Sequence, residues 1–248
     1  DKDGNIIDPY NGQSDLANKV LRHVSEAFVE DPLRILRLAR FAARFNHLGF
    51  TIFESTNQLM ISMVEDGEVD ALVPERVWRE VERVLSENSP DIFFKVLRNC
   101  GALAKLFPEI DSLYGIPNPP KYHPEIDTGI HTLMVLAAAA QISDNPRVRF
   151  AALVHDLGKA TTPKNLLPRH HGHEARGVKL VDKLCNRYKV PKNYHRLAIK
   201  VAELHGTCHR AFELRADTVA RLLKQLDAFR NPDDFFDIPM TRTHCDDI

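Results

Sequence analysis

Apolar and polar positions recur with a helical period along most of the chain. The clearest case is residues 33–46, which follow a favourable N-cap at Asp31 and a favourable first-turn residue at Pro32. One face of this segment carries the apolar side chains of Ile35, Leu36, Leu38, Ala39, Ala42 and Phe45. Arginines repeat on the other side at intervals of three or four residues, at Arg34, Arg37, Arg40 and Arg44. The pattern predicts an amphipathic helix with one buried face and one basic face.

The same period predicts further helices over residues 75–85, 91–99, 130–141, 147–157, 173–188, 193–205 and 216–229. Residues 1–25 differ, because the turn signals Asp3-Gly4, Asp8-Pro9 and Asn11-Gly12 dominate them. Prolines also interrupt the pattern between residues 114 and 124, at Pro117, Pro119 and Pro120 among others. We therefore expect an all-α protein whose domains meet in this proline-rich segment.

Composition supports a soluble globular protein. The chain has 248 residues, 33 Lys and Arg against 34 Asp and Glu, and 44% apolar residues. Its longest apolar run, residues 133–140, is far shorter than the roughly 20 residues that cross a bilayer. The chain opens without a signal peptide or an initiator Met, which suggests a fragment or a processed product. Its cysteines are scattered and form no CxxC pair, so we expect no zinc knuckle or disulfide framework and a cytoplasmic location.

Charge is distributed unevenly along the chain. Residues 164–210 hold 11 Lys and Arg against 3 Asp and Glu, together with six of the twelve histidines. A segment this basic can bind a polyanion through its phosphates, and it can equally be an ordinary solvated helix face.

Histidines and aspartates fall at the ends of successive predicted helices. His155 and Asp156 close the apolar helix over residues 147–157, and an adjacent imidazole and carboxylate can both reach one divalent ion. His131, His173, His205 and Asp227 lie on the neighbouring predicted helices. Ligands on antiparallel helices can meet in the core of a bundle, so the ordered set predicts a metal site. Each histidine taken alone is better explained as a surface residue or a satisfied core residue.

This series of histidines and aspartates resembles the HD superfamily of metal-dependent phosphohydrolases, which are all-α. The resemblance implies one or two divalent ions held by His131, His155, Asp156, His173, His205 and a terminal aspartate, either Asp227 or Asp217. It also implies catalytic roles for His155, Asp156 and Lys159. Arg169, His170, His171 and Lys159 lie nearby in the sequence and could hold the substrate phosphate or protonate the leaving oxygen.

A second group of candidate residues surrounds the start of the first helix. Asp31 and Arg34 are three residues apart, so their side chains can meet on one helix face and offer donors and acceptors to a base edge. Arg37 could then reach a triphosphate. On spacing alone, the better explanation is a helix cap with an exposed ion pair, which contributes only a few tenths of a kcal/mol.

Residues 30–45 as a whole resemble the neck motif of the bacterial CCA-adding tRNA nucleotidyltransferase and poly(A) polymerase family. The resemblance implies that Asp31 and Arg34 template the incoming CTP or ATP and that Arg37 assists. Residues 74–80 resemble a further neck motif that buttresses the first. Residues 4–12 resemble the end of the family's head domain, and residues 123–132 the entry to the HD-type body of its multifunctional members. The implied domains are a head remnant at 1–25, a helical neck at 26–115 and an HD body at 116–248.

The family's head carries a Gly-rich loop and an Asp-x-Asp pair that hold magnesium for nucleotidyl transfer, and we find neither before residue 30. The chain also stops short of the tail expected to contact tRNA, so we expect a neck-and-body fragment. The surviving chemistry implied is 2′,3′-cyclic phosphodiesterase and phosphatase activity with nickel or magnesium. The implied partners are tRNA, CTP, ATP and nucleotide or RNA-end phosphoesters, with no membrane.

Two other functions remain open from the sequence. The chain could be a noncatalytic RNA-docking module in which the basic segment binds tRNA phosphates and the histidines are structural. It could also be a free-standing HD nucleotidase with an unrelated N-terminal half, although the intact neck motif disfavours this.

Overall fold

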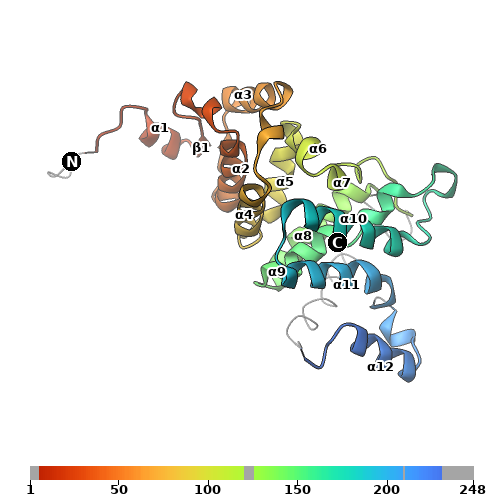
Figure 1. Ribbon diagram of the computed structural model, residues 1–248. Coiled ribbons are helices and arrows are strands. Elements are labelled where there is room, and N and C mark those ends of the chain that lie inside the picture. The colour runs from red at the N-terminus through yellow and green to blue at the C-terminus, as the bar shows by residue number, and fades with distance from the viewer. Residues whose placement is uncertain (1–5, 120–125, 209, 231–248) are drawn as a thin grey trace.

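A computed structural model describes residues 6–119, 126–208 and 210–230. Helices make up most of its elements (Figure 1), and a short 3-10 segment, Leu157–Thr161, follows α9. The helices are α1 (Gly12–Ala17), α2 (Leu33–Phe45), α3 (Glu54–Glu65), α4 (Pro74–Val84), α5 (Pro90–Asn99), α6 (Ala102–Leu106), α7 (Pro108–Asp111), α8 (Thr128–Ile142), α9 (Pro146–Val154), α10 (His173–Tyr188), α11 (Lys192–Cys208) and α12 (Ala216–Gln225). Among the described residues, the only sheet pairs β1 (Val20–Leu21) in parallel with β2 (Thr51–Ile52). The expected all-α class is confirmed.

Helix α2 shows why the hydrophobic pattern succeeded. Ile35, Leu36 and Ala39 are fully buried, whereas Arg34 and Arg37 lie on the side that faces away from the core. Helices α4 and α5 begin one residue before their predicted starts, at Pro74 and Pro90, because proline suits a first helical turn. The sequence pattern did not predict helix α3, because the apolar residues along this helix do not gather on a single face.

A single hydrophobic core crosses the proline-rich segment at which we placed the domain boundary. It extends from Leu33 on α2 to Ala202 on α11. At its middle, the indole of Trp78 on α4 meets two rings edge-on, Phe150 on α9 and Tyr194 on α11, each with a centroid separation of 5.2 Å. The helices on the two sides of the segment are therefore packed as one body, although residues 120–125 lie outside the described chain.

Arg149 adds a polar clasp at the same junction. Its side chain, only 3% exposed, donates to the carbonyls of Leu85 and Glu87, both at 2.9 Å, beyond the end of α4. It also donates to the carbonyls of Ala140 at 3.0 Å and Ser143 at 2.6 Å, at the end of α8. One guanidinium thus satisfies backbone acceptors from both halves of the molecule, which the last turn of a helix otherwise leaves without partners.

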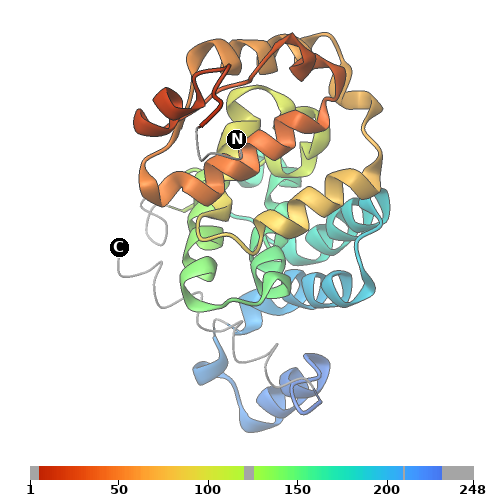
Figure 2. The same cartoon turned by 90° about the vertical axis from the view of Figure 1, so that its left-hand side faces the viewer.

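The two ends of the described chain lie apart from this body. Figures 1 and 2 show α12 below α11, which it contacts through a small cluster that includes Leu204, Leu222 and Leu226. The N-terminal arm around α1 extends away from the neck helices and leaves Ile6, Ile7 and Leu16 exposed. Within the described residues, no helix has the length and apolar character needed to span a membrane.

Candidate functional site

Four helices bring the predicted metal ligands together. Helix α8 supplies His131, the end of α9 supplies His155 and Asp156, α10 begins with His173, and the last turn of α11 supplies His205. The Asp156 carboxylate lies at the centre and is only 2% exposed. The sequence placed these residues on separate elements, and the bundle makes them neighbours.

The distances divide the cluster into two groups that share Asp156. On one side, Asp156 Oδ2 lies 3.2 Å from His155 Nε2 and 4.0 Å from His131 Nε2. On the other, Asp156 Oδ1 lies 3.3 Å from His173 Nε2 and 3.4 Å from His205 Nε2. Within each group, all ligand atoms lie within 4.8 Å of one another, which is close enough for one ion.

Backbone contacts fix how three of the rings are protonated. The Nδ1 atoms of His155, His173 and His205 lie 2.7, 2.8 and 3.1 Å from the carbonyls of Ala152, His170 and Val201 respectively. A carbonyl can only accept, so each Nδ1 carries a proton, and in the neutral form of each ring Nε2 holds the lone pair that faces the cluster. This is the orientation in which an imidazole binds a metal, with its other nitrogen held by an outer partner.

Two of these imidazole nitrogens lie unusually close together. His173 Nε2 and His205 Nε2 are only 3.1 Å apart, and two lone pairs at that distance repel unless a proton or an ion lies between them. Asp156 Oδ1 is buried and accepts no hydrogen bond from the described residues. A buried carboxylate oxygen with no hydrogen bond from the described residues, close to two imidazole nitrogens, fits a divalent cation, since imidazole and carboxylate are suitable ligands for such ions.

The surroundings of Asp156 and His173 shift the pKa values of both side chains. Burial alone would raise the pKa of Asp156, but its contacts with His155, Lys159 and His173 hold the pKa well below its usual value. Burial opposes protonation of His173 as well, yet its contacts with Asp156 raise the pKa of the ring above its usual value. In the absence of a metal, the centre thus attracts a proton where a cation would bind.

Lys159 is a buried cation beside the metal centre. Its Nζ lies 2.7 Å from Asp156 Oδ2 and donates to Asn118 Oδ1 at 3.1 Å. Asn118 is fully buried, and no sequence signal marked it, because it lies in an irregular segment between two prolines. Its contact with Lys159 joins residues 41 positions apart, which only the folded chain reveals.

Two glycines allow α10 to lie directly against the segment that carries Lys159. A Cβ added at Gly158 would lie 1.9 Å from the carbonyl oxygen of His173 and 2.5 Å from the amide nitrogen of Gly177. Both distances are shorter than any atomic contact allows, so this close approach requires glycine at position 158. Gly158 therefore helps to set the position of the ligand His173.

Several predicted residues are not brought into this cluster. Neither metal-binding group includes Asp227 or Asp217. Asp227 follows the end of α12 with its carboxylate 3.9 Å from Arg230, and Asp217 is an exposed residue that contacts Arg215 and Arg221. The helix expected over residues 216–229 ends at Gln225, which leaves Asp227 beyond it at a positive φ.

The basic residues near the metal centre have other partners than we expected. His170 uses both ring nitrogens, with Nδ1 2.9 Å from Thr162 Oγ1 and Nε2 donating to the Pro117 carbonyl at 3.0 Å. Burial lowers its pKa, which agrees with a neutral bracing residue. Both ring nitrogens of His170 are thus engaged within the protein, while Arg169 and His171 are exposed. Arg176, which the sequence did not single out, donates to Thr161 Oγ1 and Thr162 Oγ1, both at 3.0 Å.

The start of α2 forms the second candidate site. Asp31 Oδ1 accepts a hydrogen bond from the amide of Leu33 at 3.1 Å, as expected of a cap. Its Oδ2, however, accepts from Arg76 on α4 at 2.9 Å, whereas Arg34 lies 3.9 Å from Glu30. The expected pairing of Asp31 with Arg34 is wrong, because the packing of α4 against α2 offers Asp31 a closer partner. Arg76 belongs to the segment that resembled a buttressing motif.

Because Arg34 is not held by Asp31, it lines a groove beside α2. The groove has a volume of about 420 Å³ and lies between α2 and residues 22–28. Arg34 and Arg37 contribute charge, while Phe28 and Phe41 contribute aromatic surface. The sequence identified the two arginines but missed Phe28, since nothing in the linear pattern folds residues 22–28 back onto α2.

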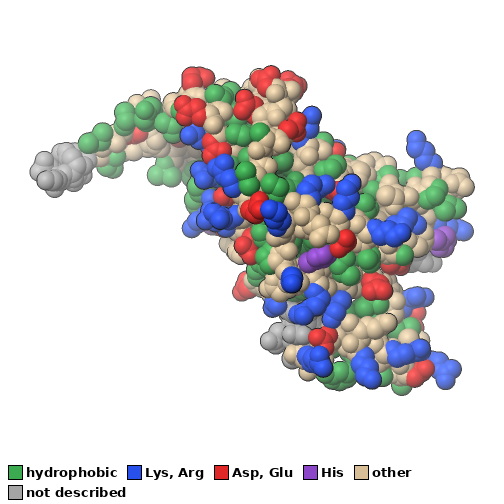
Figure 3. All heavy atoms as spheres, in the orientation of Figure 1, with side chains coloured by type: hydrophobic (Ala, Val, Ile, Leu, Met, Phe, Trp, Pro, Cys, Tyr) green, Lys and Arg blue, Asp and Glu red, His purple; other side chains and the backbone are tan. Residues whose placement is uncertain are grey.

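A buried carboxylate contacts Arg37 and Arg40 of α2. Glu80 on α4 is 2% exposed and accepts from Arg40 at 2.9 Å and Arg83 at 3.3 Å, with Arg37 Nε 3.9 Å away. Figure 3 shows the resulting concentration of Lys and Arg side chains over α2 and α4. This face therefore presents positive charge next to the groove.

Comparisons with known proteins find two family models within the chain. The family model "HD domain" matches residues 128–231, and "Probable RNA and SrmB-binding site of polymerase A" matches residues 49–114. A "Multifunctional CCA protein" of Thioalkalivibrio sulfidiphilus is 63% identical over 95% of this chain. The chain belongs to the family of the multifunctional CCA proteins. A second such protein, from Legionella pneumophila, is 57% identical over 96% of the chain.

These matches cover only part of the length of each relative. It spans 58% of the length of both relatives. A solved tRNA nucleotidyltransferase, crystallised with a primer tRNA and an incoming ATP analogue, superposes with a TM-score of 0.61. That match covers 98% of this chain and 63% of the other at 20% identity, so it confirms the neck-and-body fold alone.

Proposed function

We propose that the cluster around Asp156 is a divalent-metal centre that hydrolyses phosphoesters, in the manner of a 2′,3′-cyclic phosphodiesterase and phosphatase. The observation that carries this proposal is the convergence of His173 Nε2 and His205 Nε2, 3.1 Å apart, on the buried Oδ1 of Asp156, which accepts no hydrogen bond from the described residues. His131 and His155 complete the donor set on the opposite carboxylate oxygen.

A divalent ion such as nickel or magnesium, when bound there, polarises a phosphoryl oxygen and makes water a better nucleophile near neutral pH. The chain's own residues do the rest. Asp156 fixes both ligand groups, and backbone carbonyls keep the three rings in the ligating tautomer. Lys159, buried and held by Asn118, supplies a fixed positive charge for the phosphate and a proton donor for the leaving oxygen.

The test compares a histidine inside the metal centre with a histidine outside it. His155→Ala should remove bound metal from the purified chain, measured by mass spectrometry, and lower hydrolysis of 2′,3′-cyclic AMP by more than about 100-fold. His195→Ala is the matched control, because His195 pairs with Asp182 at 3.1 Å and belongs to neither metal-binding group. Equal activity of both variants, with folding verified by circular dichroism, would rule out the centre.

The neck groove supports a second function. We propose that Arg34 and Arg37 bind the base and triphosphate of CTP or ATP and that the chain acts within an enzyme that builds the 3′-terminal CCA of tRNA. The groove's volume of about 420 Å³ suits a nucleotide, and its arginines and aromatic rings provide charge and stacking surface. Asp31, held by Arg76, caps the helix that carries both arginines. A tRNA substrate would place the protein in the bacterial cytoplasm.

The competing assignment, a noncatalytic tRNA-docking module, gives different results in the same preparation. It requires tRNA binding that weakens with salt, no bound metal, and no effect of His155→Ala on phosphoester hydrolysis. For the neck, Arg34→Ala should weaken binding of CTP and ATP to the chain about tenfold or more while the melting temperature stays nearly unchanged. Unchanged binding of both nucleotides would show that the groove does not hold them.

A further inference from the structure

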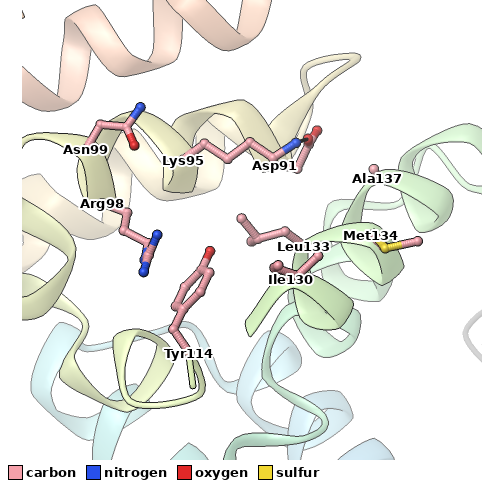
Figure 4. Close-up of a pocket in the computed structure, with 9 residues that line it drawn as sticks. All are labelled: Asp91, Lys95, Arg98, Asn99, Tyr114, Ile130, Leu133, Met134 and Ala137. Carbon is pink, nitrogen blue, oxygen red and sulfur yellow. Dashed lines mark hydrogen bonds and ion pairs between the residues drawn. The ribbon is translucent and has the colours of Figure 1, made fainter. Parts of the chain in front are cut away.

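A separate pocket lies between α5 and α8, away from the neck groove and the metal centre. Its volume is about 280 Å³, near the lower end of the range for small-molecule sites. Figure 4 shows polar side chains from α5 on one side, apolar side chains from α8 on the other, and Tyr114 rising between them. We refer to it as the α5–α8 pocket.

Arg98 presents a positive planar group to this pocket. Its guanidinium carbon lies 3.8 Å from the centroid of the Tyr114 ring, so the ring backs it. It makes no hydrogen bond or ion pair with any described residue, whereas the neighbouring Lys95 is held by Asp91 at 2.7 Å. A guanidinium backed by a ring retains its hydrogen-bond donors and offers a flat surface on which another ring can stack.

Tyr114 is held in place and keeps its proton. A Cβ added at Gly129 would come within 2.5 Å of Tyr114 Cγ, so glycine lets the ring lie directly against the start of α8. Burial raises the pKa of the phenol to about 12, and its hydroxyl therefore remains a donor near neutrality. Asn99, exposed on α5, adds an amide group at the same edge.

The opposite wall is apolar. Ile130 keeps 48% of its surface exposed, and Leu133 and Met134 extend this apolar wall along α8. The next residue after Ile130 is His131, which is buried and turned toward Asp156. Helix α8 therefore separates the pocket from the metal centre, and occupation of one does not require the other.

We propose that the α5–α8 pocket binds one nucleotide unit, with its base between Arg98 and the α8 wall and its phosphate on the donors of Arg98 and Asn99. An inorganic anion would leave the apolar wall uncovered, and an aliphatic ligand would leave the guanidinium and the phenol without partners. A ligand that combines an aromatic ring with a negatively charged phosphate satisfies both sides. The unit can be a free mononucleotide or an unpaired residue of an RNA strand, since both offer the same chemistry.

The experiment isolates this pocket from the other two sites. Binding is measured by equilibrium dialysis with radiolabelled AMP and with a hexamer of adenosine ribonucleotides. The chain carries Arg34→Ala and Arg37→Ala to disable the neck groove, and EDTA keeps the metal centre empty. In this background, Arg98→Ala should weaken binding about tenfold or more, and Tyr114→Phe should weaken it less because the ring remains. Arg196→Ala, which removes an exposed arginine of α11, is the matched control.

Each outcome decides the question. AMP binding that depends on Arg98 supports a free mononucleotide, and binding of the hexamer alone with the same dependence supports an RNA residue. If neither probe binds, or if Arg98→Ala and Arg196→Ala behave alike, the pocket does not take a nucleotide. Should Arg98→Ala lower the melting temperature markedly, Asn99→Ala replaces it, because that exposed side chain makes no hydrogen bond among the described residues, and its loss must still weaken binding.

Discussion

The tight contact at Gly158 makes a single added methyl group a test of how the metal centre is positioned. In Gly158→Ala, the new Cβ would start 1.9 Å from the carbonyl oxygen of His173, whereas ordinary contact begins near 3.4 Å. The beginning of α10 must therefore retreat by about 1.5 Å, the difference between these distances, and carry His173 with it. Because the obstacle is backbone, no side-chain rotation relieves the clash.

Overpacking of this kind costs about 1–3 kcal/mol of folding free energy. A displaced ligand should cost more at the metal centre, and we expect metal affinity to fall about 10–100-fold. The free energy of unfolding comes from urea titration, and the affinity from calorimetry with nickel. Gly177→Ala is a demanding control, because it adds the same methyl group across the same contact but meets no atom closer than 3.4 Å. Equal metal affinity in the two variants would refute the reasoning.

Three further predictions concern the clasp, the cap and the metal. Arg149→Met should lower the free energy of unfolding by about 3–5 kcal/mol, because it leaves buried carbonyls at the ends of α4 and α8 without a hydrogen-bond donor. The control Arg196→Met should change this free energy by under about 0.5 kcal/mol. Both values come from urea titrations followed by tryptophan fluorescence. Burial opposes the ionised form of Asp31, but the Leu33 amide and Arg76 lower its pKa below the ordinary 3.8. The stabilisation lost in Asp31→Asn, under about 1 kcal/mol, should therefore be present near neutrality and disappear as pH falls below that value, which thermal melts across pH can follow. Nickel at about 100 times its dissociation constant should stabilise the wild-type chain by about 2.7 kcal/mol in thermal shift, and Asp156→Asn should abolish the effect; an equal shift in both would contradict the assigned ligands.

The sequence predicted those parts of the molecule in which information is local. The burial of Ile35, Leu36 and Ala39 follows from a period that neighbouring residues share, and the spacing of His131, His155, His173 and His205 places each at a helix end. The sequence did not predict which side chains pair between helices. Asp31 bonds to Arg76 rather than Arg34 because side-chain direction depends on how α4 packs against α2, which no spacing encodes.

The same limit applies within the HD body. Nothing in the linear order brings Asn118 to Lys159, or gives His170 two partners that occupy its ring. Asp227 fell outside the cluster because the last helix ends at Gln225 rather than continuing through residue 229. The α5–α8 pocket was likewise invisible, since its two walls come from opposite sides of the proline-rich segment.

The edge-on contacts of Trp78 with Phe150 and Tyr194 have a practical consequence for dissecting this protein. A cut within residues 114–124 would not release two modules, because each half would carry away one side of a hydrophobic interface and expose aromatic rings to water. The excised pieces should aggregate rather than fold. For the same reason, exchange of the HD body between relatives should succeed only when α4, with its tryptophan, is transplanted along with it. Since Trp78 is the chain's single tryptophan, its emission would report any loosening of that seam without an added label.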